Sequence, residues 1–338
     1  MDNQRKGRPT IFDVAKESNV SIATVSRVVN DIGKVTPETR DLVLAAIKKL
    51  GFVSSNLARG LAKSHTFNVA IVVPSPNYTY MSSIIAGMVD VCKIYGYTIN
   101  YFTFEDVSDC AHVVEQVISS RVEGIAVYNS QLSSQDIQRL STINLPMVII
   151  GNDALDERNG LVTIDYSPTL FDVIRDKVKS GVKKIVFIRD PNENKDWHMV
   201  NNFQNAIIAG IQAGGGTAEF ELVHVPDYYN ALYDYCIERF TADTPNGELF
   251  ITPRDSLALA INNAATDMKI KTPDKLEIIG IIGTKAAKTA RPTISTLDVD
   301  LYEVGSITMR MLTKMLDDTL LNKVFNFKVT FSGRDTTK

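Results

Sequence analysis

The sequence of 338 residues contains little cysteine and histidine and no long apolar run. Its three cysteines, Cys92, Cys110 and Cys236, are odd in number and widely spaced, which fits neither a disulfide framework nor a zinc site. We therefore expect buried, unreacted thiols. No apolar stretch approaches the roughly eighteen residues of a membrane span, and no secretory signal precedes the first motif. These absences exclude disulfide-rich secreted proteins and membrane proteins, and they predict a cytoplasmic protein.

Signatures of catalysis are missing as well. The sequence has no G-x-S-x-G, H-E-x-x-H or P-loop motif, and its four histidines lack the spacing of metal ligands. A triple glycine at residues 214 to 216 follows a helical pattern instead of opening one, so it predicts a helix end and not a phosphate-binding loop. The sequence thus favours a protein that is not an enzyme and needs no cofactor or metal. A doubly wound enzyme is the competing class, and it would need a nucleophile, metal or cofactor motif that the sequence lacks.

Charge is distributed unevenly along the chain. Residues 1 to 65 carry eleven lysines and arginines against six acidic residues, whereas the remainder carries 25 against 33. The net charge of −3 therefore divides into about +5 at the N-terminal end and about −8 elsewhere. A basic head on an acidic body is typical of a protein that contacts nucleic-acid phosphates at one end only.

Two short helical patterns separated by a tight turn occupy residues 10 to 30. Thr10 is a suitable N-cap, with Asp13 three residues later as its capping-box partner, and Asn19 ends the first helix. Ser21 caps the second helix, which buries a stripe of valines. The opposite side of that helix, where a reader of the DNA major groove carries its side chains, holds Ile22, Ala23, Ser26 and Arg27.

A third helical pattern completes the unit. Thr36 caps it, Pro37 occupies its first position and Gly51 stops it. Its predicted buried face consists of Leu42, Ala46, Ile47 and Leu50. Together the three patterns predict a helix-turn-helix domain over residues 1 to 53, and an unrelated set of small amphipathic helices is the alternative.

Residues 10 to 15, 20 to 30 and 58 to 61 resemble the lactose-repressor (LacI/GalR) family of bacterial transcription regulators. The segment T-I-F-D-V-A matches the start of the family motif, V-S-I-A-T-V-S-R-V-V-N its recognition segment, and A-R-G-L its hinge. The resemblance runs the length of the chain. It implies a homodimer that places two recognition helices in successive major grooves of a pseudo-palindromic operator.

The resemblance assigns base reading to the second helix. Arg27 is the candidate for a bidentate contact to guanine, which provides about 1–3 kcal/mol of discrimination. Ile22 and Ala23 predict apolar contacts, for example to a thymine methyl group. The residues predicted to position the head on the DNA backbone are Thr10, Ser21, Thr24, Asn30, Lys34 and Thr39. Ser26, on the outward side of the second helix, is a further predicted DNA contact.

Residues 54 to 66 match the family's hinge helix, which orders when two protomers pair over the operator. Leu61 would wedge between base pairs in the minor groove, with Ala58 allowing close approach and Arg59 near the phosphates or the groove. Asn56 is the fourth predicted contact. The family's usual Pro-Asn is Ser-Ser here, and a plain flexible linker is the alternative.

From residue 67 onwards, strand-like apolar runs alternate with helical patterns, the rhythm of parallel βαβ units. The rhythm restarts after Asp165, which predicts an α/β core of two doubly wound halves. The resemblance implies the type I periplasmic-binding-protein architecture, with a ligand cleft between the halves. We predict a first half of residues 67 to 163 plus 291 to 323, and a second half of 164 to 290 plus 324 to 338. A last strand is expected at residues 325 to 330.

Residues at strand ends are the candidates for an effector site in this cleft. They are Tyr78, Tyr80, Tyr128, Asp153, Trp197 and Asp255. Each has a structural alternative, namely packing at the rim for the tyrosines, anchoring of a loop for the tryptophan and helix capping for Asp255. Two positions depart from the family, because its ligand-binding arginine aligns with Met199 and its carboxylate with Ile282. The effector is therefore unusual, or the cleft no longer binds one.

Residues 86 to 90, 309 to 314 and 336 to 338 resemble the catabolite control protein A branch of the family. That branch is switched by a protein co-repressor, serine-phosphorylated HPr, which docks on the first half of the core. Arginine is the appropriate partner for a phosphoserine, and Arg291 and Arg310 are the candidates. The resemblance implies a repressor in carbon catabolite control or sugar metabolism. A sugar-responsive repressor of a local operon with an unusual effector, or a paralogue without the co-repressor site, is the alternative.

Overall fold

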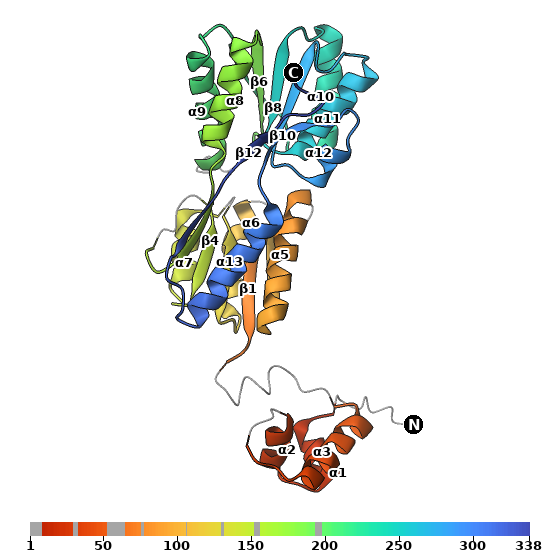
Figure 1. Cartoon of the computed structure of the whole chain (residues 1–338), viewed down its shortest axis with the longest axis vertical. Helices are drawn as coiled ribbons and strands as arrows, with labels where there is room; N and C mark the ends of the chain where they lie inside the picture. The colour runs from red at the N-terminus through yellow and green to blue at the C-terminus, as the bar shows by residue number, and fades with distance from the viewer. Residues whose placement is uncertain are drawn as a thin grey trace. The chain divides into compact units, whose positions relative to one another are not determined.

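The computed structural model describes residues 9–29, 33–52, 65–75, 78–105, 107–129, 132–151, 156–192 and 198–338. The chain divides into a helical unit that ends at Phe67 and an α/β core that begins at Asn68 (Figure 1). Several predicted site residues lie outside the described residues: Asn30, Asn56, Ala58, Arg59, Leu61, Asp153 and Trp197.

The helical unit consists of α1 Ile11–Ser18, α2 Ile22–Val29 and α3 Pro37–Leu50. Thr10 and Asp13 form the predicted capping box, in which the Thr10 amide donates to the Asp13 carboxylate at 2.7 Å. Asn19 ends α1 in the left-handed region at φ 53°, which asparagine tolerates better than most residues. Thr36 caps the N-terminus of α3 and Gly51 ends the helix, as the sequence predicts.

A small apolar core holds these three helices together. Val14, Val25 and Val43 are fully buried, and Val28 and Ala46 are nearly so. The predicted buried face of α3 was wrong at one position, because Leu42 is 57% exposed and Val43 occupies the core instead. Val43 and Ala46 share one side of the helix at a spacing of three residues, and the packing against α1 selects that side over the one that begins at Leu42.

The first half of the core is a six-stranded parallel sheet with the strand order β11-β5-β4-β3-β1-β2. Strand β1, the first along the chain, is apolar over almost its whole length, as expected for a strand that is covered on both faces of the sheet. The elements are β1 Asn68–Pro74, α5 Thr79–Tyr95, β2 Thr98–Phe104, α6 Val107–Ser119, β3 Gly124–Tyr128, α7 Ser134–Ser141, β4 Met147–Ile150, β5 Gly160–Ile164, α13 Leu301–Leu316 and β11 Val324–Phe327.

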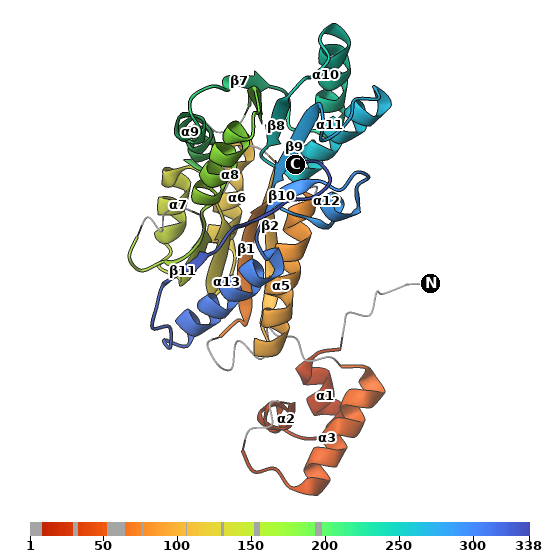
Figure 2. The same ribbon diagram turned by 45° about the horizontal axis from the view of Figure 1, so that its top comes forward.

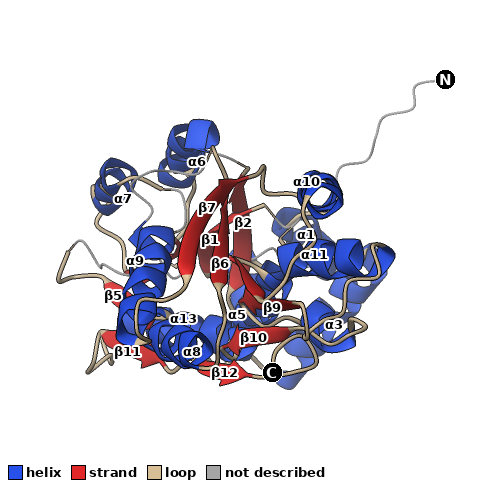
Figure 3. Cartoon of the chain, turned by 90° about the horizontal axis from the view of Figure 1, so that it is seen from above, coloured by secondary structure: helices blue, strands red, loops and turns tan. Residues whose placement is uncertain are grey.

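The second half is a six-stranded sheet with the order β12-β10-β9-β8-β6-β7, in which only β12 runs antiparallel to its neighbour. Helices flank the strands on both sides (Figure 3). The elements are α8 Ser167–Lys179, β6 Lys184–Arg189, α9 His198–Ala213, β7 Glu219–His224, α10 Tyr229–Ala242, β8 Glu248–Thr252, α11 Asp255–Asp267, β9 Leu276–Ile281, α12 Lys285–Thr289, β10 Ser295–Asp298 and β12 Thr330–Ser332. The predicted doubly wound α/β core is thus confirmed.

The predicted borders between the halves need correction. β10 pairs with β9 and therefore belongs to the second half, so the chain crosses to the first half after Asp298 and not at residue 291. β11 pairs with β5 of the first half, and the chain returns to the second half only at β12. The single predicted strand at residues 325 to 330 is consequently two short strands, because each one completes a different sheet.

Helices α5 and α13 lie side by side on the first sheet (Figures 1 and 2). Two glycines make this close contact possible. A Cβ atom on Gly87 would lie 2.0 Å from the carbonyl oxygen of Tyr302, and one on Gly305 would lie 1.9 Å from that of Ile84. Because the obstacles are backbone atoms, no rearrangement of side chains can make room for a larger residue.

Candidate DNA-binding surface, cleft and co-repressor surface

Helix α2 exposes the side that the sequence predicts to read bases. Val25 and Val28 are buried against α1 and α3, whereas Ala23 and Arg27 are exposed and Ile22 is 41% exposed. An exposed isoleucine on so small a unit is an apolar surface suited to base methyl groups. The three outward side chains therefore form the candidate recognition face, which extends from Ile22 to Arg27 on α2.

The predicted backbone-positioning residues are partly engaged within the unit. The Ser21 hydroxyl accepts a hydrogen bond from the Thr24 amide at 3.1 Å, and it caps α2 as expected. Thr39 accepts one from the Thr36 hydroxyl at 3.0 Å, and Lys34 is exposed before α3. Ser21 and Thr39 therefore lie at the N-terminal ends of α2 and α3, the part of a helix at which backbone amides can bind phosphate.

Three predicted cleft tyrosines come together at the carboxyl ends of strands β1 and β3. Tyr80 and Tyr128 are 6% and 7% exposed, with ring centroids 5.9 Å apart, and Tyr78 stacks on Tyr80 at 5.7 Å. Burial raises the pKa of Tyr128 to about 12 and that of Tyr80 well above its usual value. These hydroxyls are protonated at any physiological pH, so they serve as hydrogen-bond donors and apolar surface.

Asp255, a predicted effector ligand, is buried and hydrogen-bonded within the protein. It is 1% exposed, and one of its carboxylate oxygens accepts hydrogen bonds from the amide and the hydroxyl of Thr284, both at 2.6 Å. Burial raises its pKa, although these hydrogen bonds oppose the shift. The contact joins the start of α11 to the loop before α12.

The position after β9, where the family carries a carboxylate, is apolar. Ile282 is 3% exposed and has a φ of 67°, a left-handed conformation that is costly for a β-branched residue. Gly283 follows it, and a Cβ atom there would lie 1.6 Å from the Asp298 carboxylate. The side chain of Met199, the other departure from the family, lies outside the described residues.

Sequence reasoning missed two charged residues beside the tyrosines. The Arg254 side chain is only 12% exposed, and its guanidinium forms an ion pair with Asp227, which is 21% exposed. The same group lies 4.5 Å from the ring centroid of Tyr78. Burial raises the pKa of Asp227 despite the attraction of the arginine. The sequence feature that could have identified Arg254 is its position just after strand β8 and next to the predicted residue Asp255.

The two candidate phosphoserine ligands lie in different halves. Arg310 is exposed on α13, which covers the first sheet. Arg291 precedes β10 of the second sheet, and its guanidinium donates to the carbonyl oxygens of Thr289 and Ala290 at 3.2 and 2.7 Å. The prediction that placed Arg291 in the first half was therefore wrong.

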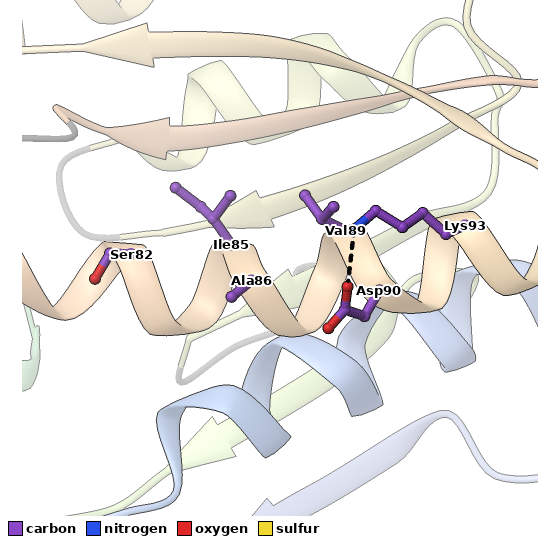
Figure 4. Close-up of a pocket in the computed structure, with 6 residues that line it drawn as sticks. All are labelled: Ser82, Ile85, Ala86, Val89, Asp90 and Lys93. Atoms are coloured by element: carbon purple, nitrogen blue, oxygen red, sulfur yellow. Dashed lines mark hydrogen bonds and ion pairs between the residues drawn. The ribbon is translucent and has the colours of Figure 1, made fainter.

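One side of α5 forms a shallow, mainly apolar groove (Figure 4). Its polar end is closed by Asp90, which accepts from Lys93 at 3.1 Å and from the Tyr302 hydroxyl of α13 at 3.1 Å. The residues that line it are Ser82, Ile85, Ala86, Val89, Asp90 and Lys93.

Within the part of the chain that the structure describes, none of the helices combines the length and the apolar character that a membrane span requires.

Comparisons with known proteins agree with this architecture. The model of the family described as bacterial regulatory proteins, lacI family, matches residues 10–55, and that of the periplasmic binding protein-like domain matches residues 175–337. Catabolite control protein A of Priestia megaterium is 27% identical over 97% of this chain and 99% of its own length. The HTH-type transcriptional regulator pepR1 of Lactobacillus delbrueckii subsp. lactis is 30% identical over 92% of both chains.

Solved structures show the same fold. The lac repressor dimer bound to operator and the anti-inducer ONPF matches with a TM-score of 0.82 at 18% identity, over 98% of this chain and 99% of that one. The transcription regulator CcpA of Lactococcus lactis matches with a TM-score of 0.65 at 23% identity, over 80% of this chain and 99% of its own. The match over residues 10–55 covers the capped helices α1 to α3, and the match over residues 175–337 lies within the α/β core. The chain belongs to the lacI family of bacterial regulatory proteins and is a DNA-binding transcriptional regulator.

Proposed function

We propose that this regulator acts in the cytoplasm as a homodimeric repressor of a pseudo-palindromic operator. The observation that carries the proposal is the recognition face of α2, where Ile22, Ala23 and Arg27 point away from the buried valines. Arg27 would bind guanine in the major groove, and the two apolar residues would contact thymine methyl groups. Thr10, Ser21, Thr24 and the other residues predicted for the head and hinge would fix the register on the backbone.

The groove on α5 supports the dimer. Ile85, Ala86 and Val89 are an apolar strip on a surface helix, and a second copy related by a two-fold axis presents the same strip in return. Asp90 and Lys93 at its end already form an ion pair within the helix at 3.1 Å, so they add no net charge to the surface that a second copy would cover. A two-fold protein matches the two half-sites of a pseudo-palindrome.

A phosphoserine protein is the co-repressor that we favour. Arg310 is exposed on α13, the helix that packs on α5, and a guanidinium binds a phosphate in a bidentate manner. The similarity to catabolite control proteins supports serine-phosphorylated HPr as this partner. Arg291 lies in the other half, so it would contribute only if the partner reached across both.

A sugar-type small molecule in the cleft is the alternative. The stacked tyrosines Tyr78, Tyr80 and Tyr128 favour it, because aromatic rings pack against sugar rings. The buried Ile282 weighs against it, since an apolar side chain replaces a carboxylate that would bind sugar hydroxyls. Asp255, engaged with Thr284, weighs against it as well.

The proposal is tested by titrating the full-length protein onto a family-type palindromic operator, measured by fluorescence anisotropy with and without serine-phosphorylated HPr. We expect specific binding that falls steeply with salt and tightens with the phosphoprotein but not with unphosphorylated HPr. Specific operator binding that does not change with the phosphoprotein would reject the proposed co-repressor but would still support sequence-specific DNA binding. Binding that does not distinguish the operator from random DNA would reject the proposal.

Replacing Arg27 by alanine should weaken operator binding by about 1–3 kcal/mol, roughly fivefold to 150-fold, and relax the preference for guanine at one position of each half-site. Lys48→Ala is the matched control, because it removes the same charge from an exposed position on α3 without touching the recognition face. The control should weaken all sequences uniformly and slightly. If Arg27→Ala lowered the affinity for random DNA as much as the affinity for the operator, as the control does, Arg27 would make no base-specific contact.

A further inference from the structure

One guanidinium contacts both halves of the core. Arg254 lies between β8 and α11 of the second half, where it forms its ion pair with Asp227 and donates to the carbonyl oxygen of the same residue at 3.0 Å. Its other neighbour is the ring of Tyr78, 4.5 Å away, which precedes α5 of the first half. The two halves are thus joined by side chains of the protein itself.

The surroundings of this contact give it strength. Tyr78 is backed by the stacked ring of Tyr80 and, beyond it, by the buried ring of Tyr128, so the aromatic face that meets the cation is held in place. The carboxylates nearby, Asp227, Asp190 and Glu105, all favour a cation at this point. A cation over an aromatic ring is worth more where water is excluded than at an exposed site.

The contact is also incompletely satisfied. The Nε atom of Arg254 is buried and has no hydrogen-bond partner among the described residues. A buried donor without a partner raises the free energy of the closed state. The cation over the ring therefore favours closure, while the unpaired Nε–H adds a cost that opening to water would remove.

We propose that Arg254, oriented by Asp227, is a latch that closes the two halves on Tyr78 without a bound small molecule. In a regulator of this architecture, closure is ordinarily decided by the free energy of a ligand that binds both halves. Here a side chain of the second half takes that place. Loss of the latch should change the ratio of closed to open molecules by roughly tenfold. The proposal concerns the core alone, so it holds whether or not the co-repressor or the operator assignment is correct.

Tyr78 provides a sharp test because its ring and its hydroxyl can be separated. Tyr78→Phe keeps the aromatic face beneath Arg254, whereas Tyr78→Leu removes it with little change in size. A second, independent variant combines Arg254→Gln with Asp227→Asn, which removes both charges and leaves no buried ion without a partner. Thermal unfolding of each variant shows that the core still folds.

Closure is measured far from the latch, so that local loosening alone does not alter the signal. Spin labels at Gln135→Cys on α7 and Gln212→Cys on α9 occupy exposed positions in the two halves, and the native cysteines are buried. Double electron–electron resonance on the full-length chain, diluted into unlabelled protein and without ligand, reports the distance between the halves.

The expected result is one narrow distance distribution for the parent chain and for Tyr78→Phe. Tyr78→Leu and the double variant should add a second population at longer distance. Unchanged distributions in both folded variants would overturn the latch. A Tyr78→Phe variant that opens like Tyr78→Leu would also overturn it, because the hydroxyl and not the aromatic face would then be the contact. Neither result bears on operator binding, which the anisotropy titration tests separately.

Discussion

Replacing Gly305 by alanine should lower the free energy of unfolding of the core by about 3 kcal/mol or more. The new Cβ atom would lie 1.9 Å from the Ile84 carbonyl oxygen of α5, so α13 must move away along its whole contact with that helix. Alanine is ordinarily the better helix former by about 1 kcal/mol. The sign of the effect therefore separates the two causes, since steric separation destabilises and helix propensity stabilises.

Urea unfolding followed by circular dichroism measures this change through the transition midpoint. Glu303→Ala is the control, because Glu303 is an exposed residue two positions earlier on the same helix. It should change stability by less than about 0.5 kcal/mol. A Gly305→Ala protein as stable as its parent, or more so, would mean that the helices do not cross as closely as described.

The consequence of this variant for regulation follows from what the two helices carry. α5 bears the proposed dimer groove and α13 bears Arg310, the proposed phosphoserine ligand. Gly87 of α5 packs in turn against the backbone of α13, because a Cβ atom on it would lie 2.0 Å from the Tyr302 carbonyl oxygen. A pair of helices fixed by backbone contact transmits a displacement at one surface to the other, since neither can shift alone.

The helix-turn-helix unit was largely predictable because its signals are local. The Thr10 capping box, the Thr36 cap and the Gly51 stop each depend on residues within one or two turns. Leu42 was misplaced because the helical pattern allows two neighbouring faces of α3 to be apolar, and only the packing against α1 chooses between them. Local sequence fixes the helix but not its rotation.

The borders between the halves were less predictable for a different reason. The sequence predicts a strand near β11 but none at β10, and no local pattern shows which sheet either segment joins. Thr296 pairs with Gly280 in the second sheet, and Val324 pairs with Leu161 in the first. A short strand carries too little pattern to specify which of two similar sheets it joins.

Among the residues between the two halves, the three tyrosines were predicted from the sequence and the arginine was not. Tyr78, Tyr80 and Tyr128 follow the general rule that sites form at the carboxyl ends of parallel strands. Arg254 follows the same rule but matched no family position, so its meaning depended on Asp227 and Tyr78. One lies 27 residues away and the other belongs to the opposite half, and no spacing rule joins the three.

Replacing Lys177 by methionine should cost about 3–5 kcal/mol of stability, because it leaves a buried carboxylate without its cation. Lys177 of α8 and Glu277 of β9 have side chains only 8% and 9% exposed, and their Nζ and Oε2 atoms are 2.5 Å apart. The same ammonium donates to the carbonyl oxygen of Lys338 at 2.6 Å, and the Lys338 amide donates to Glu277 at 3.1 Å. The pair therefore joins a helix, a strand and the last described residue of the chain.

The double variant Lys177→Met with Glu277→Leu distinguishes the value of the pair from the cost of breaking it. Two apolar side chains of similar size leave no buried charge, so most of the lost stability should return, apart from about 1 kcal/mol for the Lys338 amide. Arg139→Met is the control, because the Arg139–Glu115 pair is equally short at 2.5 Å but 61% and 48% exposed. It should cost less than about 1 kcal/mol.

The single variant Glu277→Leu completes the cycle, and urea unfolding of the parent, the two single variants and the double variant then gives the coupling energy of the pair. A Lys177→Met variant no less stable than the Arg139→Met control would show that water reaches Glu277 and solvates it. A double variant as unstable as the single one would mean that Lys338 and its neighbours depend on the charged pair itself. In that case β9, whose carboxyl end leads to Ile282 and the cleft, would be held in register by ionic contacts instead of by its apolar packing.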